Sequence, residues 1–482
     1  MNTKLFSLQE QAATNVKWAS VSRIGGQGLQ FATTVILARL LLPSDFGLIG
    51  MAMVVIGFVE VFRDLGTSAA IVQRQELNDS ILSSIFWCNV GFALLCALVV
   101  CLLSPLVAMF YKETRLTPIL LGLSLCLLFS GAGVLHSALL QRNLAFNVLA
   151  KIELTSACIG AGIAIGLALY GAGVWALVFQ ALFTSLASTA LLWSRSSWRP
   201  SFIFSWPEIR SVSGYSLNLT GYRVFNYLAR NADYLLIGRY LGAADLGYYT
   251  LAYQIMLYPV RNITAVISRV LFPLFSKIQD DNLRFRNAYL KICFAIAIVV
   301  FPMMAGVWIV SKYLILAVFG QRWEPVILLL LILSPLGMIQ AIGATVGSIY
   351  QAKGRTDWIF LWGIGSGIFL TIAFIIGLQW GVVGVAGAYT IAGIILFYPN
   401  FILPFRLIEL KFRELLKALS RPLLCTLLMV FLLLGAKFFL PGSLNPAWSL
   451  SILVLLGILI YCAASWWLNR EQVLEVVEVL KS

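Results

Sequence analysis

The sequence predicts an all-α membrane protein with about fourteen transmembrane helices. Of its 482 residues, 60% are hydrophobic and 11% are charged, whereas about 25% of residues are charged in soluble globular proteins. Apolar runs of roughly 20 residues recur along the chain, and each is long enough to cross the hydrocarbon core of a bilayer. Helices are expected because they satisfy their own backbone polar groups in lipid, and the alternating pattern of a β-barrel is absent.

The first half of the chain holds six of the expected spans. They lie at about 17–41, 46–64, 80–107, 116–140, 148–170 and 173–194. The first two form a hairpin around Leu42-Pro43-Ser44-Asp45, and a polar, aromatic linker over residues 194–210 follows the sixth span. We assign residues 1–200 to a first lobe.

The second half repeats this arrangement and adds two spans. The six repeated spans are expected at about 211–240, 246–273, 284–310, 324–350, 357–380 and 383–407. We assign residues 201–408 to a second lobe. Residues 409–482 are expected to form a basic amphipathic connector, two further spans at about 422–440 and 447–468, and a C-terminal surface helix.

Short motifs that recur about 200 positions apart indicate an internal duplication. An arginine, an aspartate and a glycine of the first hairpin reappear in the second half, as Arg39, Asp45, Gly47 and Arg239, Asp245, Gly247. Two lobes in the same orientation imply a pseudo-two-fold axis along the membrane normal, and such repeats build transporters whose substrate binds near the midplane. A structural arginine–aspartate pair is expected at the corner of each lobe.

The distribution of positive charge predicts the orientation. The chain has 34 Lys and Arg against 20 Asp and Glu, a net charge of +14. Most of the basic residues fall in segments on the same side as the N-terminus when fourteen spans are threaded. Because cytoplasmic loops carry the excess of Lys and Arg, both termini are expected in the cytoplasm. This placement explains the basic balance without nucleic acid as a partner.

No metal, cofactor or catalytic site is expected. The eight cysteines fall in apolar spans without a CxxC pair, and there is one histidine, so metal and disulfide sites are not predicted. The chain has no GxxxxGK[ST] phosphate-binding loop, and Gly25-Gly26-Gln27-Gly28 lies inside a span, where close helix packing is the interpretation. No connecting segment exceeds about 17 residues, which is too short for a catalytic domain. We therefore expect a protein that is not an enzyme.

Charged residues inside the spans are candidates for a functional site, because each is costly in hydrocarbon. The first lobe contributes Arg23, Glu60 and Glu153, with His136 as a possible partner, and the second contributes Asp233. The acids either neutralise arginines or couple ion movement. His136 is either such a partner or a satisfied core residue.

Arginines dominate the second lobe. Arg223 and Arg230 are seven residues apart, so two helical turns place them on one face, with Asn226 beside them. Arg261 and Arg269 lie eight residues apart on the next span. Arginine suits phosphate because its planar, permanently charged group forms bidentate hydrogen bonds. The pattern predicts an anionic, phosphorylated substrate, although a structural role also fits these arginines.

Two stretches resemble a known family. Residues 35–74, VILARLLLPSDFGLIGMAMVVIGFVEVFRDLGTSAAIVQR, resemble the opening signature of polysaccharide exporters in the multidrug/oligosaccharidyl-lipid/polysaccharide superfamily. Residues 269–281, RVLFPLFSKIQDD, are similar to the segment after the eighth span in the colanic-acid exporter group. The similarity covers most of the first 400 residues and is weaker in the last two spans.

The resemblance implies a V-shaped bundle with a central cavity in the bacterial inner membrane. The implied substrate is an oligosaccharide repeat unit on undecaprenyl pyrophosphate, moved by alternating access for exopolysaccharide, capsule or O-antigen synthesis. Membrane lipid, a polysaccharide polymerase and export machinery are the implied partners. Two other functions stay open at this point. They are a cation-coupled multidrug exporter of the same fold and a membrane polymerase or ligase that joins glycans.

Overall fold

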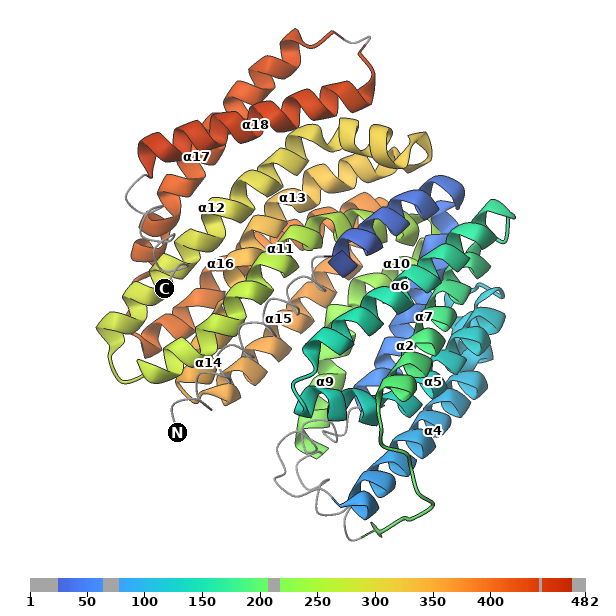
Figure 1. Cartoon of the computed structure of the whole chain (residues 1–482). Helices are drawn as coiled ribbons and strands as arrows, with labels where there is room; N and C mark the ends of the chain where they lie inside the picture. The colour runs from blue at the N-terminus through green and yellow to red at the C-terminus, as the bar shows by residue number, and fades with distance from the viewer. Residues whose placement is uncertain (1–24, 64–77, 207–216, 442–443, 470–482) are drawn as a thin grey trace. The chain divides into compact units, whose positions relative to one another are not determined.

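The computed structural model describes residues 25–63, 78–206, 217–441 and 444–469 (Figure 1). Every regular element within these ranges is a helix, which confirms the predicted all-α class. The chain divides into two compact units, Met1–Ala244 and Asp245–Ser482, and each is described by itself. The sequence-based division into residues 1–200, 201–408 and 409–482 stays a prediction.

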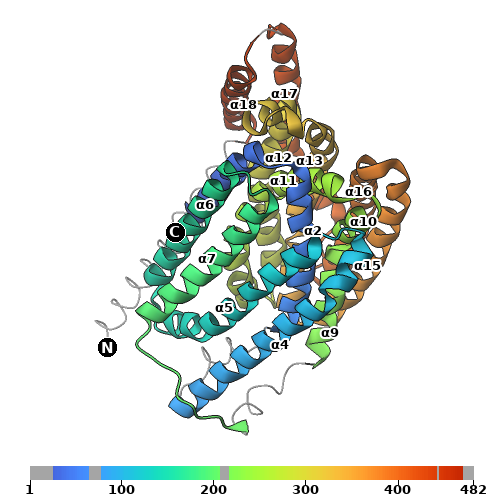
Figure 2. The same cartoon turned by 90° about the vertical axis from the view of Figure 1, so that its right-hand side faces the viewer.

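The first unit is a helical bundle that begins with a helix over residues 25–40. The helices that follow are α2 (Pro43–Arg63), α4 (Asp79–Tyr111), α5 (Leu116–Arg142), α6 (Phe146–Leu169), α7 (Val174–Arg195), α9 (Leu217–Arg230) and α10 (Ala232–Tyr240). In the bundle α4 packs on α5, α5 on α7, and α6 on α7 (Figure 2). Both α9 and α10 pack against α2.

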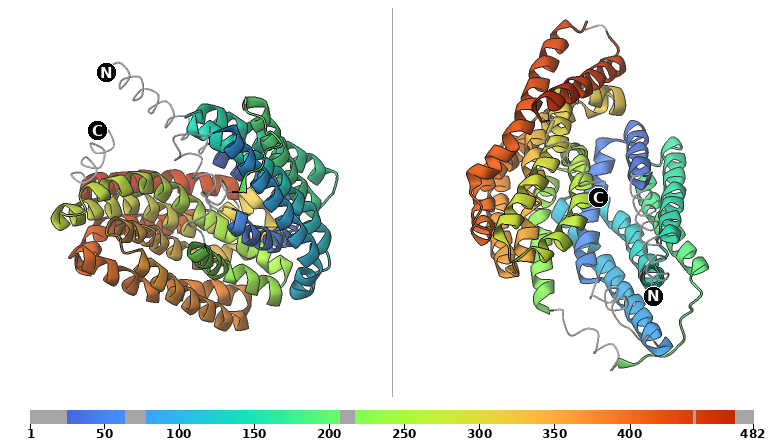
Figure 3. Two further views of the ribbon diagram at one scale, coloured as in Figure 1. Left: turned by 90° about the horizontal axis from the view of Figure 1, so that it is seen from below. Right: turned by 60° about the vertical axis from the view of Figure 1, so that its left-hand side comes forward.

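The second unit repeats the same pattern of helix pairing. Its helices are α11 (Ala243–Lys277), α12 (Asn282–Leu314), α13 (Pro325–Gly343), α14 (Val346–Ala352), α15 (Thr356–Gly377), α16 (Gly381–Leu407), α17 (Phe412–Phe439) and α18 (Pro446–Leu468). The first two residues of α11 precede the boundary of the unit at Asp245. Here α12 packs on α13, α13 on α16, and α15 on α16. The hairpin of α17 and α18 packs on α12 (Figures 1 and 3). The repeated pairing is what an internal duplication predicts.

Ten stretches of the described residues are long and apolar enough to cross a membrane. One of them, Asp357–Leu407, contains both α15 and α16. Three predicted spans are not among the ten. The first is helical over residues 25–40, the seventh corresponds to α9 and α10, and the eighth lies within α11. The chain is therefore a multi-pass membrane protein.

Local sequence signals explain where key helices begin. Pro43 occupies the first position of α2, where its missing N–H costs nothing. The backbone N–H of Leu42 donates to Asp45 Oδ2 at 3.0 Å, which is the acidic half of a capping box. At α12 the side chain of Asp281 accepts from the N–H of Arg284 at 3.0 Å. These caps fix the starts of α2 and α12, which begin two or three residues before the predicted spans at about 46 and 284.

The same glycine turn joins the last two helices of each copy. Gly171, before α7, has φ +79° and Gly381, at the start of α16, has φ +69°. Residues with a side chain rarely adopt this left-handed backbone conformation, whereas glycine adopts it without steric cost. The match of Tyr170-Gly171 with Trp380-Gly381 in the sequence thus corresponds to a shared backbone geometry.

Two predicted spans are interrupted in ways that their hydropathy did not indicate. The seventh breaks at Asn231, whose side-chain amide donates to Tyr227 O at 2.8 Å. The tenth breaks between α13 and α14 at Thr345. The Thr345 hydroxyl lies 2.8 Å from Tyr289 OH and donates to Ile342 O at 2.7 Å. Polar side chains that bond the nearby backbone compete with the helix ladder, which accounts for both breaks.

Candidate functional site

The contact between α9 and α2 positions the helix that carries the predicted Arg223, Asn226 and Arg230. The Tyr227 hydroxyl on α9 donates to Val54 O on α2 at 3.0 Å. The Tyr227 ring lies 6.2 Å from that of Phe58. A Cβ at Gly57 would overlap the Tyr227 hydroxyl, so a side chain at position 57 would displace the Tyr227 ring from this contact. This contact fixes the rotation of α9 about its axis.

The predicted arginine stripe lies beside that contact. Asn226 is half-buried and Arg230 is exposed, and helical spacing places both next to Tyr227 on the surface of α9. Arg223 belongs to the same helix, but its side chain is outside the described residues. Glu60, exposed on α2, lies close enough to Tyr227 for its charge to act on the hydroxyl. Arginine, amide, phenol and carboxylate thus gather along one edge of the unit.

In the second unit, Arg261 is exposed on α11, and the side chain of Arg269 is outside the described residues. A polar cluster that sequence reasoning missed lies among three helices of this unit. Gln340 of α13 donates to the hydroxyl of Tyr389 on α16 at 2.9 Å, and Tyr253 OH of α11 lies 3.3 Å from that hydroxyl. The glutamine within an apolar helix was the available signal.

Two further predicted residues belong to the first unit. Glu153 is exposed on α6, and the neighbouring Leu154 side chain lies 3.6 Å from where a Cβ on Gly25 would be. Arg23 itself is outside the described residues. Asp233 is buried in the first turn of α10, where its carboxylate accepts from the N–H of Tyr234 at 2.9 Å. A carboxylate at a helix N-terminus is stabilised by the helix dipole, which favours a structural role.

The corner residues also have structural surroundings. The Asp45 carboxylate is buried and caps α2, whereas Arg39 is exposed. The guanidinium of Arg239 lies 5.7 Å from the ring centres of both Phe110 and Tyr240. Cation–π contacts of this kind suit a cation at the end of a membrane helix. The predicted arginine–aspartate pairs stay predictions.

His136 lies in an aromatic box and not beside the arginine stripe. Its ring centre is 4.7 Å from that of Trp193, 5.7 Å from Trp198 and 6.3 Å from Phe86. The side chain is fully buried. Neither ring nitrogen has a hydrogen-bond partner among the described residues. The geometry favours the core interpretation of His136.

The box is closed by the linker segment, residues 196–206, which follows α7. Ser201 Oγ lies 2.8 Å from Ser83 Oγ on α4, and the N–H of Ser201 also donates to Ser83 at 3.1 Å. Trp87 Nε1 donates to Ser201 O at 2.9 Å, and Trp198 Nε1 donates to Asp79 Oδ1 at 3.2 Å. The linker segment is thus bound to the start of α4.

Among the residues that the structure describes, no group of three or more His, Cys, Asp and Glu side chains could hold a metal ion. The described side chains offer guanidinium, amide, phenol and carboxylate groups, and the first three can bind an anionic, hydroxyl-rich molecule.

Sequence comparisons place this chain among proteins of polysaccharide synthesis. Residues 36–328 match the family described as polysaccharide biosynthesis protein. The chain is 30% identical over 396 residues to the lipopolysaccharide biosynthesis protein WzxC of Escherichia coli K12, covering 81% of this chain and 80% of that protein. It is 30% identical over 460 residues to the teichuronic acid biosynthesis protein TuaB of Bacillus subtilis, covering 94% and 95%.

Solved structures show the fold. The lipid II flippase MurJ in its inward closed conformation superposes with a TM-score of 0.76 at 18% identity, covering 94% of this chain and 99% of that one. An inward-facing multidrug resistance transporter of the MATE family superposes with a TM-score of 0.63 at 15% identity, covering 79% and 94%. The helical architecture is thus one that flippases and drug exporters share.

Proposed function

We propose a transport function, because the chain belongs to the polysaccharide biosynthesis protein family. In this proposal it is a flippase, and not an enzyme, that moves oligosaccharide repeat units linked to undecaprenyl pyrophosphate across the bacterial inner membrane. The observation that carries the proposal is a 30% identity over 94% of the chain to a teichuronic acid biosynthesis protein, on a fold shared with a lipid II flippase. Both termini lie in the cytoplasm, in keeping with the placement of Lys and Arg.

The arginines supply the recognition of the head group. Arg230 on α9 and Arg261 on α11 are exposed, and both lie in predicted spans, where a cation is costly unless it binds an anion or lines water. A pyrophosphate offers two phosphoryl groups, and guanidinium groups bind each with charge-assisted bonds. Arg23, Arg223 and Arg269 add to this set, Asn226 bonds the glycan, and Glu60, Glu153 and Asp233 tune the charge. Transport proceeds by alternating access.

The multidrug exporter is the second candidate, because the chain also superposes on a MATE transporter. A cavity for cationic drugs is expected to be lined by acids, since opposite charges attract. The exposed ionisable groups of α9 and α11 considered above are instead arginines. The family is described as polysaccharide biosynthesis protein, and the two relatives are named for lipopolysaccharide and teichuronic acid biosynthesis, so the flippase is favoured.

Deletion of the gene in its own host tests the proposal. We expect lipid-linked repeat units to accumulate on the cytoplasmic side of the membrane, and surface polysaccharide to fall, while resistance to cationic dyes stays unchanged. Extraction of lipid-linked glycans, with accessibility to an added glycosidase, measures the accumulation. Loss of dye efflux with normal glycan turnover identifies the drug exporter instead. Chain extension by the purified protein identifies a polymerase or ligase.

A further inference from the structure

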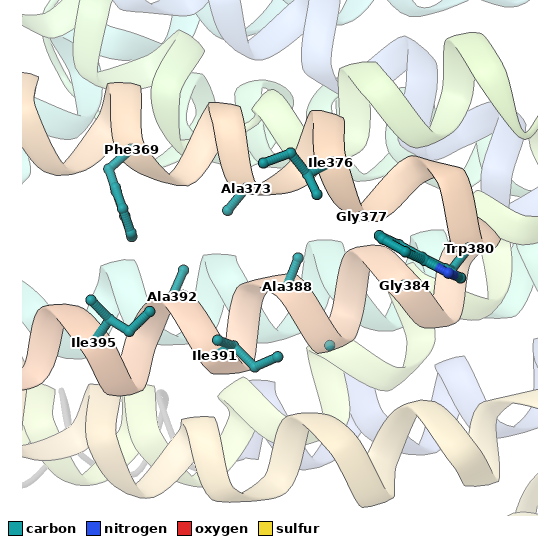
Figure 4. A pocket seen from close by; sticks show the side chains of 11 residues that line it. Phe369, Ala373, Ile376, Gly377, Trp380, Gly384, Ala388, Ile391, Ala392 and Ile395 are labelled. Carbon is teal, nitrogen blue, oxygen red and sulfur yellow. The ribbon is translucent and has the colours of Figure 1, made fainter.

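An apolar groove of about 400 Å³ lies between α15 and α16 in the second unit (Figure 4). Aromatic, branched and small residues line it, namely Phe369, Ala373, Ile376, Gly377, Trp380, Gly384, Gly387, Ala388, Ile391, Ala392 and Ile395. No lining residue carries a charge. Both helices belong to the candidate membrane span Asp357–Leu407, so the groove is a feature of the lipid-facing part of the molecule.

Small residues give the groove its depth. A Cβ on Gly377 would lie 2.6 Å from Gly384 O, so the two helices touch near their connecting turn. Farther along α16, nothing lies within 4 Å of where a Cβ on Gly387 would be. The helices therefore touch near the turn, Phe374 and Tyr389 still pack across the pair with ring centres 5.1 Å apart, and the groove lies along one side. Figure 4 shows Phe369 and Ile395 at the far end of this space.

The length of the groove matches one leaflet of a bilayer. It runs from Phe369 on α15 to Trp380 in the short 3-10 turn after that helix, and eleven residues of helix rise about 16 Å. This is roughly half of the 30 Å hydrocarbon core. Trp380 is 66% exposed at the turn, and tryptophan is enriched where a span meets the polar interface. A chain that enters at Trp380 is thus covered to about the middle of the bilayer.

The walls favour a branched hydrocarbon chain. Exposed side chains border the groove once per turn on α16, where Ile391 is 61% and Ile395 is 54% exposed. One turn rises 5.4 Å. An isoprenoid chain carries a methyl branch at every fourth backbone carbon, and four such bonds advance roughly 5 Å. Its branches can therefore fall between successive side chains, whereas a straight acyl chain has no groups to fill those spaces.

We propose that this groove binds the isoprenoid chain of the lipid-linked substrate within one leaflet. This inference rests on the proposed flippase function, because that function supplies an isoprenoid substrate. The groove holds the chain in the hydrocarbon while the charged head group and the glycan are bound elsewhere on the protein. Binding by burial of apolar surface is strongest for the chain that fills the space most completely.

Photocrosslinking of the full-length protein tests the inference. The probe is undecaprenyl phosphate that carries a diazirine on its chain, added to nanodiscs of phosphatidylglycerol and phosphatidylethanolamine. We expect peptides from residues 369–395 to be labelled, and unlabelled undecaprenyl phosphate to compete. Equal competition by phosphatidylglycerol, or labelling spread evenly over the exposed spans, would overturn the inference.

Two glycines of this helix pair provide a matched variant and control. Gly387→Phe fills the groove, and Gly365→Phe adds the same ring to α15 outside it, where nothing lies within 4 Å of a Cβ. We expect labelling to fall about tenfold in G387F, the factor expected when about two carbons of the chain lose their burial, and to stay unchanged in G365F. Unchanged labelling in G387F would contradict the groove assignment.

Gly387→Leu covers the possibility that G387F is not recovered as a folded protein. The smaller side chain is expected to reduce labelling about threefold, and full labelling in a folded G387L counts against the groove. Because the probe carries no glycan and no transport is measured, the result is separable from the proposed function. Labelling without glycan transport rejects the flippase alone, and transport without labelling rejects the groove alone.

Discussion

The two copies of the repeat share their frame and differ in what they do with it. In the first copy α4 packs on α5, α5 on α7, and α6 on α7; in the second, α12 packs on α13, α13 on α16, and α15 on α16. In each copy, a residue that follows α7 or α16 forms a hydrogen bond with the first residue of α4 or α12. Trp198 donates to Asp79 in the first copy and Asn282 donates to Glu409 at 3.1 Å in the second.

The two copies differ in how closely their helices pack and in how their segments are held. The first copy closes its α6–α7 pair, because Gly160 approaches Thr184 directly, and binds its linker segment to α4. The second copy breaks its fourth helix at Thr345 and opens a groove between α15 and α16. The first copy is therefore the more closed of the two. Duplication therefore explains the shared helix pairing, whereas features specific to function are expected where the two copies differ.

The largest expected effect is on transport, and it tests whether charge in α9 and α11 is what distinguishes the site. Replacing Arg223, Arg230 and Arg261 together with alanine should reduce polysaccharide export at least about 100-fold, because each charged hydrogen bond contributes roughly 1.5–3 kcal/mol. Export is measured in a deletion host that carries the variant. The control is Arg284→Ala, since Arg284 is an exposed partner of Asp281. Equal export by both variants contradicts the site.

Close helix approach in each copy should give the next effect. Gly160→Leu places a Cβ onto the Thr184 hydroxyl, and Gly384→Leu places one 2.6 Å from the Trp380 Cβ. Overpacking should lower the free energy of unfolding by about 3 kcal/mol in each. Thermal unfolding in detergent measures the loss. Gly162→Leu and Gly387→Leu, where nothing lies within 4 Å of a Cβ, are the controls. A loss of stability in only one of the two variants would contradict the equivalence of these helix contacts in the two copies.

The linker contacts should separate the copies by a smaller amount. Ser83→Ala leaves the N–H of Ser201 without its acceptor, which should cost about 1–2 kcal/mol because Ser83 is fully buried. Glu409→Ala removes an exposed bond to Asn282 and should cost less than about 0.5 kcal/mol. Thermal unfolding and limited proteolysis near residue 206 report the difference. Equal losses mean that the linker is no more firmly bound than the second connector.

The smallest effect concerns pH and a loop outside the spans. Arg115 donates to both carboxylate oxygens of Glu113, at 2.8 and 2.9 Å, and these bonds hold the pKa of Glu113 below its ordinary value. A carboxyl group whose pKa is lowered in the folded state stabilises the fold at pH values above its unfolded-state pKa. That stabilisation is lost as the pH falls through the folded-state pKa. Glu113→Gln should thus lower the free energy of unfolding by less than about 0.5 kcal/mol at neutral pH, seen as a slightly lower Tm, and should have no effect in acid. A difference that persists in acid contradicts the ion pair.

Much of the frame was predictable from local sequence. Apolar runs located the spans, and Pro43 and Asp45 located the start of α2, because these signals act on the backbone beside them. The turn glycines Gly171 and Gly381 were visible as a repeat, since only a shared backbone geometry requires glycine at both.

The candidate site was predictable only in part. Helical spacing grouped Asn226 with Arg230, but the contact of Tyr227 with α2 joins residues 173 positions apart and leaves no local pattern. The break at Thr345 depends on Tyr289 of another helix, so hydropathy could not indicate it. The groove between α15 and α16 arises from where two helices diverge, which composition does not encode.

The central claim is that the chain moves a lipid-linked oligosaccharide between leaflets. The most direct measurement uses proteoliposomes with undecaprenyl-pyrophosphate-linked repeat units in both leaflets and a glycosidase added outside. We expect the glycan of the inner leaflet to become cleavable in the presence of the protein, and to stay protected with the triple arginine variant. Protection of half of the glycan in the presence of the intact protein would contradict the account.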